Sequence, residues 1–216
     1  MIVLNLKTYE QSIQKSLLFT DIASEAVANS GLRIIVCPPT PLLSEAASRY
    51  NHIFSQHADF ELPGAFTGSI PPELLKCLKV SGSLVNHSEK KLPIEKIRKT
   101  LDRMHSVGLE SIACAATTNE ALEIVSSTPS MIAVEPPDLI GSGSSVTKAN
   151  PNIILNSVRA IKEVNHKIKV LCGAGISTKE DVEKAISLGA EGVLLASAFV
   201  KAKDPKEFLF DLVSAF

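Results

Sequence analysis

The chain has 216 residues, 45% of them hydrophobic, and a formal net charge of −1. A chain of this length can bury one sizeable core, and its near-neutral charge gives no electrostatic reason to expect a nucleic-acid partner. The first residues, MIVLNLKTYE, lack the basic start of a signal peptide, and no apolar run approaches the roughly 20 residues that span a membrane. We therefore expect a cytoplasmic protein that binds neither nucleic acid nor membrane.

The four cysteines predict free, buried thiols in a reducing compartment. No two of them form a C-x-x-C motif, and no spacing of cysteine and histidine matches a zinc site. Three lie at the ends of apolar runs, where buried thiols are common. The four are Cys37, Cys77, Cys114 and Cys172.

Eight short apolar runs recur along the chain and predict eight strands. Runs of about four to six residues, rich in Val, Ile and Leu and bounded by turn residues, are typical of strands buried on both faces. The runs cover residues 2–6, 33–37, 52–56, 83–86, 111–114, 131–134, 168–172 and 192–195.

Helical patterns lie between these runs. Residues 93–108 place apolar side chains on one stripe and stop at Gly108, and residues 177–189 begin at Ser177 or Thr178 as N-cap and stop at Gly189. Residues 150–164 form a third such segment, opened by Asn-Pro.

Eight strand–helix repeats predict a parallel α/β sheet closed into a (β/α)8 barrel, one domain over residues 1–216. Such barrels typically have about 250 residues, so some helices must be short. The alternative is an open doubly wound sheet, which usually carries a G-x-G-x-x-G motif after its first strand. This chain has NLKTYEQ there, which favours the barrel.

The connection after the third run, HADFELPGAFTGSIPP, shows neither helical nor strand periodicity. Connections this long in a compact domain are usually functional or disordered. Phe60, Leu62 and Phe66 argue against disorder, so we expect a projecting loop that docks onto a partner.

Three polar residues follow the apolar runs, at the strand ends where barrel enzymes carry their chemistry. Alternation places Lys7 opposite Leu4 and Leu6, so Lys7 either points into the barrel mouth or extends to water. His87 lies at an apparent helix start, where the dipole favours a neutral ring; a structural histidine is the alternative. Glu135 is either a buried base with a raised pKa or a strand-end acid paired with a lysine.

Two further segments suggest a closed phosphate site. Prolines 136 and 137 stiffen the chain after the sixth run, and Gly141 and Gly143 loosen it, which suits either a lid or an ordinary turn. The seventh and eighth runs end in CGAGIS and LLASAF, whose small residues either let backbone N–H groups approach a phosphate or simply allow close packing.

Taken together and in this order, these segments resemble the triosephosphate isomerase family, and its archaeal branch in particular. The resemblance implies a single-domain TIM barrel that interconverts dihydroxyacetone phosphate and D-glyceraldehyde 3-phosphate in glycolysis and gluconeogenesis, with no metal or cofactor. The matching stretches are NLKTY (5–9), GAFTG (64–68), NHSEKK (86–91), EPPDLIGSG (135–143), CGAGIS (172–177) and GVLLASAFVKAKDP (192–205).

The resemblance also implies roles for individual residues. Glu135 matches the base that moves a proton between C1 and C2, and His87 matches the neutral electrophile that polarises the carbonyl. Lys7 matches the lysine that holds the dianionic substrate. Asn5 matches the hydrogen-bonding neighbour of that lysine, and Glu89 matches the acid that pairs with the same lysine. A carboxylate base beside a histidine whose lowered pKa keeps the ring neutral is a known pattern of this enzyme.

The same resemblance assigns the phosphate site and the assembly. Residues 136–143 match a closing lid that places Ile140 and Gly141 over the phosphate, and the loop 57–70 matches one that inserts, with Thr67, into a neighbouring subunit. A homodimer or homotetramer is therefore expected. The backbone cradle for the phosphate corresponds to Gly175, Ala196 and Ser197.

The chain departs from the family pattern beside that cradle. Ala198 and Phe199 stand where archaeal relatives commonly have a glycine and a smaller residue, so the added ring is expected to affect phosphate affinity. The helices of the fourth to sixth units also look short, which leaves dimer and tetramer open. Two other functions stay open as well: another phosphate-binding barrel enzyme, or a non-catalytic barrel that binds a phosphorylated ligand.

Overall fold

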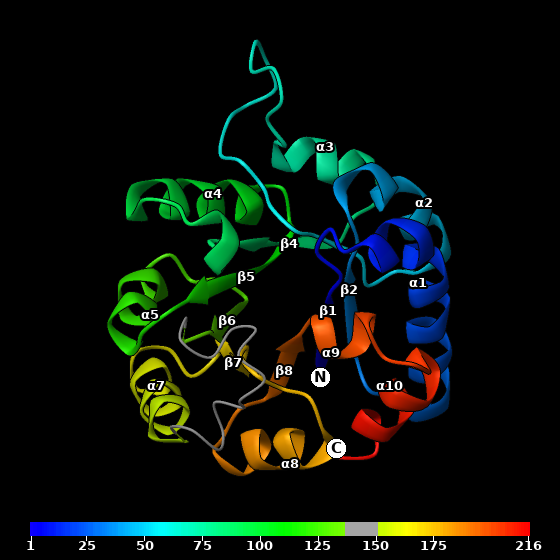
Figure 1. The fold of residues 1–216 in the computed structure, drawn as a ribbon. Helices are drawn as coiled ribbons and strands as arrows, with labels where there is room; N and C mark the ends of the chain where they lie inside the picture. The colour runs from blue at the N-terminus through cyan, green and yellow to red at the C-terminus, as the bar shows by residue number, and fades with distance from the viewer. Residues whose placement is uncertain (137–150) are drawn as a thin grey trace.

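The computed structural model describes residues 1–136 and 151–216, and its eight parallel strands form a barrel (Figure 1). The strands pair in the order β2-β1-β8-β7-β6-β5-β4-β3, and a parallel bridge between Val36 and Ile53 joins the two ends. The predicted TIM barrel is therefore confirmed. The strands are β1 (Ile2–Asn5), β2 (Ile34–Cys37), β3 (Phe54–Ser55), β4 (Gly82–Val85), β5 (Glu110–Ala115), β6 (Met131–Val134), β7 (Lys169–Cys172) and β8 (Gly192–Leu195).

Helices surround the barrel on its outer face (Figure 1). Within the described residues they are α1 (Glu10–Ser30), η1 (Thr40–Leu42), α2 (Leu43–Arg49), α3 (Pro72–Cys77), η2 (Ser88–Lys90), α4 (Ile94–Ser106), α5 (Thr118–Val125), α7 (Pro151–Val164), α8 (Lys179–Ser187), α9 (Ser197–Val200) and α10 (Pro205–Val213). None of these helices is long and apolar enough to cross a membrane.

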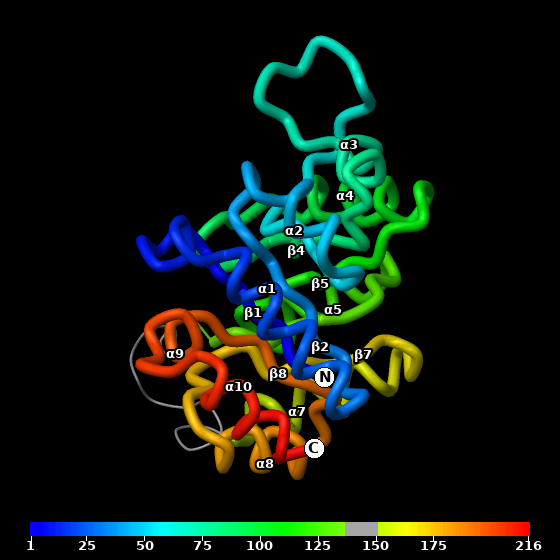
Figure 2. The backbone as a smooth tube through the Cα atoms, turned by 90° about the vertical axis from the view of Figure 1, so that its right-hand side faces the viewer, coloured from blue at the N-terminus to red at the C-terminus, as the bar shows by residue number. Residues whose placement is uncertain are grey.

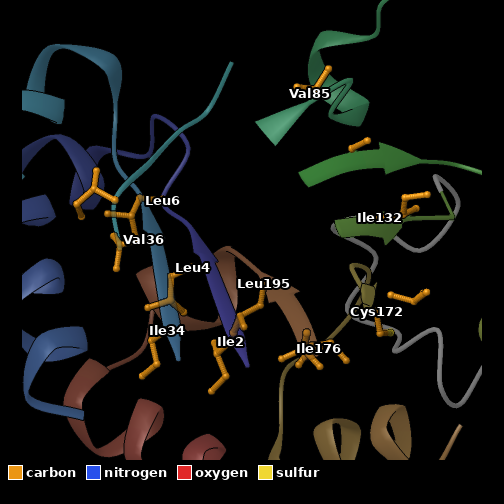
Figure 3. Packing of buried hydrophobic residues seen from close by; sticks show 14 of the residues in the cluster. Ile2, Leu4, Leu6, Ile34, Val36, Val85, Ile132, Cys172, Ile176 and Leu195 are labelled. Atoms are coloured by element: carbon orange, nitrogen blue, oxygen red, sulfur yellow. The ribbon is translucent and has the colours of Figure 1, made fainter. Parts of the chain in front are cut away.

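The two faces of each strand build two separate cores. On β1, Ile2 and Leu4 pack with Leu6 in the cluster between the strands and the helices (Figure 3). Val3 belongs instead to the cluster that fills the barrel interior. This alternation follows from the two-residue period of a strand. The interior cluster consists of Val3, Ile35, Cys37, Phe54, Leu84, Ile112, Cys114, Met131, Ala133, Leu171 and Leu194.

Helix ends follow the predicted signals. Thr178 caps α8, accepting the Asp181 N–H in a capping box, and Gly108 and Gly189 adopt positive φ just beyond α4 and α8. The third strand is shorter than predicted: only Phe54–Ser55 is strand, with Ile53 held by its bridge to Val36.

The expectation of short helices in the fourth to sixth units holds for α5 but not for α4 and α7. The helices α4 and α7 have 13 and 14 residues, and α5 has 8. Two further helices are shorter still: α2 and α3 have 7 and 6 residues. Amphipathic spacing revealed α4 from the sequence, but it did not reveal how short α2 and α3 would be.

The connection between β3 and α3 projects away from the barrel, as Figure 2 shows. Its side chains include exposed Leu62 and Phe66, at 61% and 51% of their full accessibility. At the neck of the loop, the Asp59 N–H donates to the Ile70 carbonyl (2.9 Å) and the Ile70 N–H donates to Asp59 Oδ2 (2.8 Å). The prediction of a projecting apolar loop is confirmed.

The cysteine prediction holds in part. All four thiols are free, and Cys37, Cys114 and Cys172 are buried, but Cys77 is exposed. Cys77 ends the short helix α3 rather than a strand, and so lacks the burial that a strand end gives the other three.

Candidate active site

The carboxyl ends of the strands bring three of the predicted polar residues to one cavity of about 360 Å³, whereas Asn5 and Glu89 lie beside it. Lys7 follows β1, His87 follows β4 and Glu135 follows β6, and all three line it. Because all strands of a parallel barrel end at the same rim, residues distant in sequence converge there.

Glu135 is a buried carboxyl group at the end of β6. Its N–H donates to the Ala115 carbonyl (2.8 Å), which continues the β5–β6 ladder, and the residue is 2% exposed. Burial raises the pKa of Glu135 to about 7, while a hydrogen bond with the Cys114 thiol acts in the opposite direction. Its Oε2 atom has no hydrogen-bond partner among the described residues. A carboxyl with this pKa can accept and release a proton near neutral pH.

Gly173 makes room for this carboxylate. A Cβ at Gly173, just after β7, would lie 2.4 Å from Glu135 Cγ and 3.2 Å from its Oε1. Glycine is therefore required at this position by close packing rather than by backbone angle. This role was not predicted, because the contact joins two strands and leaves no local signal in the sequence.

His87 faces Glu135 as a neutral imidazole. Its Nε2 lies 3.6 Å from Glu135 Oε1, and its Nδ1 accepts the Glu89 N–H (3.2 Å). An acceptor at Nδ1 places the proton of the neutral ring on Nε2, which points toward Glu135. Burial, followed by the Lys7 charge, lowers the pKa of His87 to about 4.

The predicted neutral ring at His87 thus has a different main cause. The helix that follows it, η2, is a single turn of three residues, so the helix dipole is small. Desolvation and the neighbouring ammonium of Lys7 keep the proton off the ring instead.

Lys7 points into the barrel mouth, with its side chain 14% exposed. Its Nζ lies 2.8 Å from Glu89 Oε1, and its own N–H donates to Asn5 Oδ1 (3.1 Å). Its φ of 48° lies in the left-handed region, which costs a residue with a Cβ about 1–2 kcal/mol. Such strain is found mainly where the surrounding structure enforces it for function.

A second polar network holds the segment that carries His87. Asn86, with φ of 62°, donates through Nδ2 to the Cys114 carbonyl (2.9 Å) and to Glu120 Oε1 (2.8 Å). Its Oδ1 accepts the Leu92 N–H (2.9 Å), and Lys91 pairs with Glu120. This anchoring role was not predicted, although asparagine is the residue type that tolerates positive φ.

The small residues expected to cradle a phosphate line the same cavity. Gly175 has φ of 69°, and Ala196 and Ser197 open the short helix α9. Lys201 and Tyr9 also line the cavity, with Lys201 Nζ 4.9 Å from the centre of the Tyr9 ring. No role was predicted for either residue.

The ring of Phe199 does not line the cavity. It is fully buried and packs edge-on against Phe19 of α1, with ring centres 5.0 Å apart, whereas Ala198 does line the cavity. The ring therefore adjoins the cradle only through the backbone of α9, and it anchors that helix to α1 with its side chain turned away from the cavity.

Some predicted positions are not brought to the cavity. Thr67 is exposed on the projecting loop. Ile140 and Gly141, with the other lid residues 137–143, lie outside the described residues.

The chain resembles known proteins over its whole length. The family model described as "Triosephosphate isomerase" matches residues 1–216. Curated triosephosphate isomerases from three archaea align with it: Methanocaldococcus jannaschii (43% identical, covering 99% of this chain and 98% of that protein), Methanobrevibacter smithii (41%, 99% and 97%) and Methanosarcina barkeri (42%, 98% and 96%). With its barrel and with Lys7, His87 and Glu135 around one cavity, the chain belongs to the triosephosphate isomerase family.

Proposed function

We propose that this chain interconverts dihydroxyacetone phosphate and D-glyceraldehyde 3-phosphate by proton transfer through an enediolate. The observation that carries the proposal is the pairing of two buried groups 3.6 Å apart: a carboxyl whose pKa is raised to about 7 and an imidazole whose pKa is lowered to about 4. At neutral pH the first can act as base and the second stays an uncharged hydrogen-bond donor.

Each group has a place in the transfer. The Glu135 carboxylate takes a proton from one carbon of the substrate and returns it to the neighbouring carbon. The His87 Nε2–H donates to the carbonyl oxygen, so that negative charge developing there meets a hydrogen bond rather than water. The Lys7 ammonium holds the dianionic substrate, and Asn5 and Glu89 fix that lysine in position.

The phosphate group occupies the other end of the cavity in this proposal. Backbone N–H groups of Gly175, Ala196 and Ser197 bind it, because small side chains let the main chain approach. The lid over residues 136–143 then closes, with Ile140 and Gly141 over the phosphate. Closure keeps water from the enediolate, which otherwise loses its phosphate. Hydrogen bonds and one lysine supply the stabilisation, so the proposal needs no metal or cofactor.

The proposed assembly is a homodimer or homotetramer in the cytoplasm, formed through the loop 57–70. The exposed Leu62 and Phe66 support this, since apolar side chains on a projecting loop are stabilised when a partner covers them. Thr67 then reaches the neighbouring subunit. Free thiols at all four cysteines fit a reducing compartment.

The test is turnover of D-glyceraldehyde 3-phosphate, coupled to a reductase that consumes dihydroxyacetone phosphate. Wild-type protein should turn over rapidly with a chelator present, and Glu135→Gln should abolish turnover because an amide cannot accept the proton. Glu135→Asp retracts the carboxylate by about one methylene and should lower kcat about 100-fold, with little effect on binding of a phosphorylated enediolate mimic.

The outcomes separate the remaining functions. Absent turnover with intact binding of the mimic would overturn the proposal and indicate either a non-catalytic barrel or an enzyme for another phosphorylated substrate. Near-normal turnover by Glu135→Asp would remove Glu135 from the role of base.

A further inference from the structure

The backbone of Lys7 adopts a conformation that its sequence alone does not favour. With φ of 48°, this residue sits in the left-handed region, which residues other than glycine and asparagine rarely occupy. Its N–H is held by Asn5 Oδ1 at 3.1 Å. The ladder between β1 and β2 ends just before it, where the Leu6 N–H donates to the Cys37 carbonyl (3.1 Å). Another contact is therefore needed to hold the Lys7 carbonyl.

The side chain of Gln56 supplies that contact. Its Nε2 donates to the Lys7 carbonyl at 3.0 Å and to the Cys37 carbonyl at 3.0 Å. Two carbonyl oxygens can be satisfied only by the amide nitrogen, so the orientation of this amide is determined by its partners. Gln56 thus bridges the chain ends that leave β1 and β2, from its own place just after β3.

We propose that Gln56 is a positioning residue for catalysis: its amide holds the Lys7 main chain so that the ammonium reaches the substrate. The inference rests on the proposed function, which gives Lys7 its role. Lys7 Nζ is paired with Glu89, which is 58% exposed at its side chain, so this ion pair alone is a mobile anchor. The main-chain clamp by Gln56 fixes the Cα from which the side chain extends.

The test is a double-mutant cycle between Gln56 and Lys7, because Gln56 is proposed to act only through the lysine. The variants are Gln56→Met, which keeps the length but loses the donor, Lys7→Ala, and the pair. The readout is the dissociation constant of a phosphorylated hydroxamate that mimics the enediolate, which can be measured even where turnover is lost. Ser55→Ala is the matched control, because the Ser55 hydroxyl also donates to a main-chain carbonyl, that of His57 (2.7 Å), but not to Lys7.

We expect Gln56→Met to weaken binding of the mimic about 10-fold and to lower kcat/KM by about 10- to 100-fold, as a small misplacement of a charged group does. In the Lys7→Ala background the same change should alter binding less than about 2-fold, which is the additivity limit for uncoupled sites. Ser55→Ala should leave kcat/KM and binding close to those of the wild type.

Equal weakening in both backgrounds, or no weakening in either, would overturn the proposal. If Gln56→Met does not fold, Gln56→Leu replaces it, since leucine also lacks the donor, adds no charge that could couple to Lys7, and should give the same pattern. If the wild-type protein shows no isomerase activity, that separate result overturns the proposed function, whatever the double-mutant cycle gives.

Discussion

The cavity and the projecting loop place side chains in opposite environments, each of which costs free energy. The cavity buries a carboxyl group and an imidazole, at 2% and 6% exposure, whereas the loop 57–70 exposes Leu62 and Phe66 by more than half. Burial of a charge costs free energy unless it is paired, and exposed apolar surface forgoes the stabilisation that burial brings.

The difference lies in how each region is held. Hydrogen bonds within the chain fix all three cavity residues: Lys7 is held by the Gln56 side chain, His87 by the Glu89 N–H and Glu135 by the Ala115 carbonyl. The loop is tied at its neck by Asp59 and Ile70, while its tip extends from the barrel (Figure 2). The cavity is therefore expected to respond to changes in charge and geometry, and the loop to changes in association.

Apart from the Glu135 variants, the largest effect is expected from His87→Gln, which replaces the Nε2–H donor in the cavity. We expect kcat to fall by about 100-fold or more, within the range of a lost acid–base group, with little change in affinity for inorganic phosphate. Steady-state kinetics and phosphate inhibition measure the two quantities. Collapse of phosphate affinity would make His87 a binding or structural residue.

The pH dependence follows from the raised pKa of Glu135. Its carboxylate form is needed as base, so kcat/KM should fall about tenfold per pH unit below about 7 and level off above it. His87 has a pKa of about 4 and should add no limb above pH 5. Unphosphorylated glyceraldehyde is the suitable substrate, since a phosphate group titrates near pH 6 and would obscure the limb. A rate that is constant from pH 5 to 9 would contradict this assignment.

The loop offers the corresponding test of association. Phe66→Lys places a charge on the apolar tip, and we expect it to lower the molar mass in solution toward that of one chain, measured by light scattering. Thr67→Ser, at the adjacent exposed position, is a conservative control that should keep the wild-type mass. An unchanged mass for Phe66→Lys would mean that subunits do not meet through this loop.

A smaller effect is expected at the far wall of the cavity. Lys201→Met removes a positive charge beside the small residues at the β7 and β8 ends, and KM should rise a few-fold, as exposed charges contribute modestly. Lys203→Met is the control, since Lys203 is exposed but does not line this cavity. The increase should diminish at high salt; identical KM values for both variants would assign Lys201 no part in binding.

Much of the barrel can be predicted from the sequence, because apolar runs and the alternation of side chains within a run are both local signals. Apolar runs give the strands, and alternation within one run already places Lys7 opposite Leu4. The position of Glu135 directly after a strand is equally local. These features depend on residues within a few positions of one another, which periodicity captures.

What the sequence did not reveal depends on contacts between strands. Gly173 is required because Glu135 packs against it, and Gln56 matters because two carbonyls from other strands face its amide. Phe199 turns toward Phe19 rather than the cavity for the same kind of reason, since its ring packs against α1, a helix of 21 residues that is distant in sequence. Register and side-chain direction across strands have no local signature.

The most direct test of the account is isomerisation in heavy water. Proton transfer through Glu135 exposes the abstracted hydrogen to exchange with solvent, so product formed from dihydroxyacetone phosphate in D₂O should carry deuterium at C2, as mass spectrometry or NMR can show. Product free of deuterium at C2 would indicate direct hydride transfer between the two carbons and would contradict the assignment of Glu135 as the base.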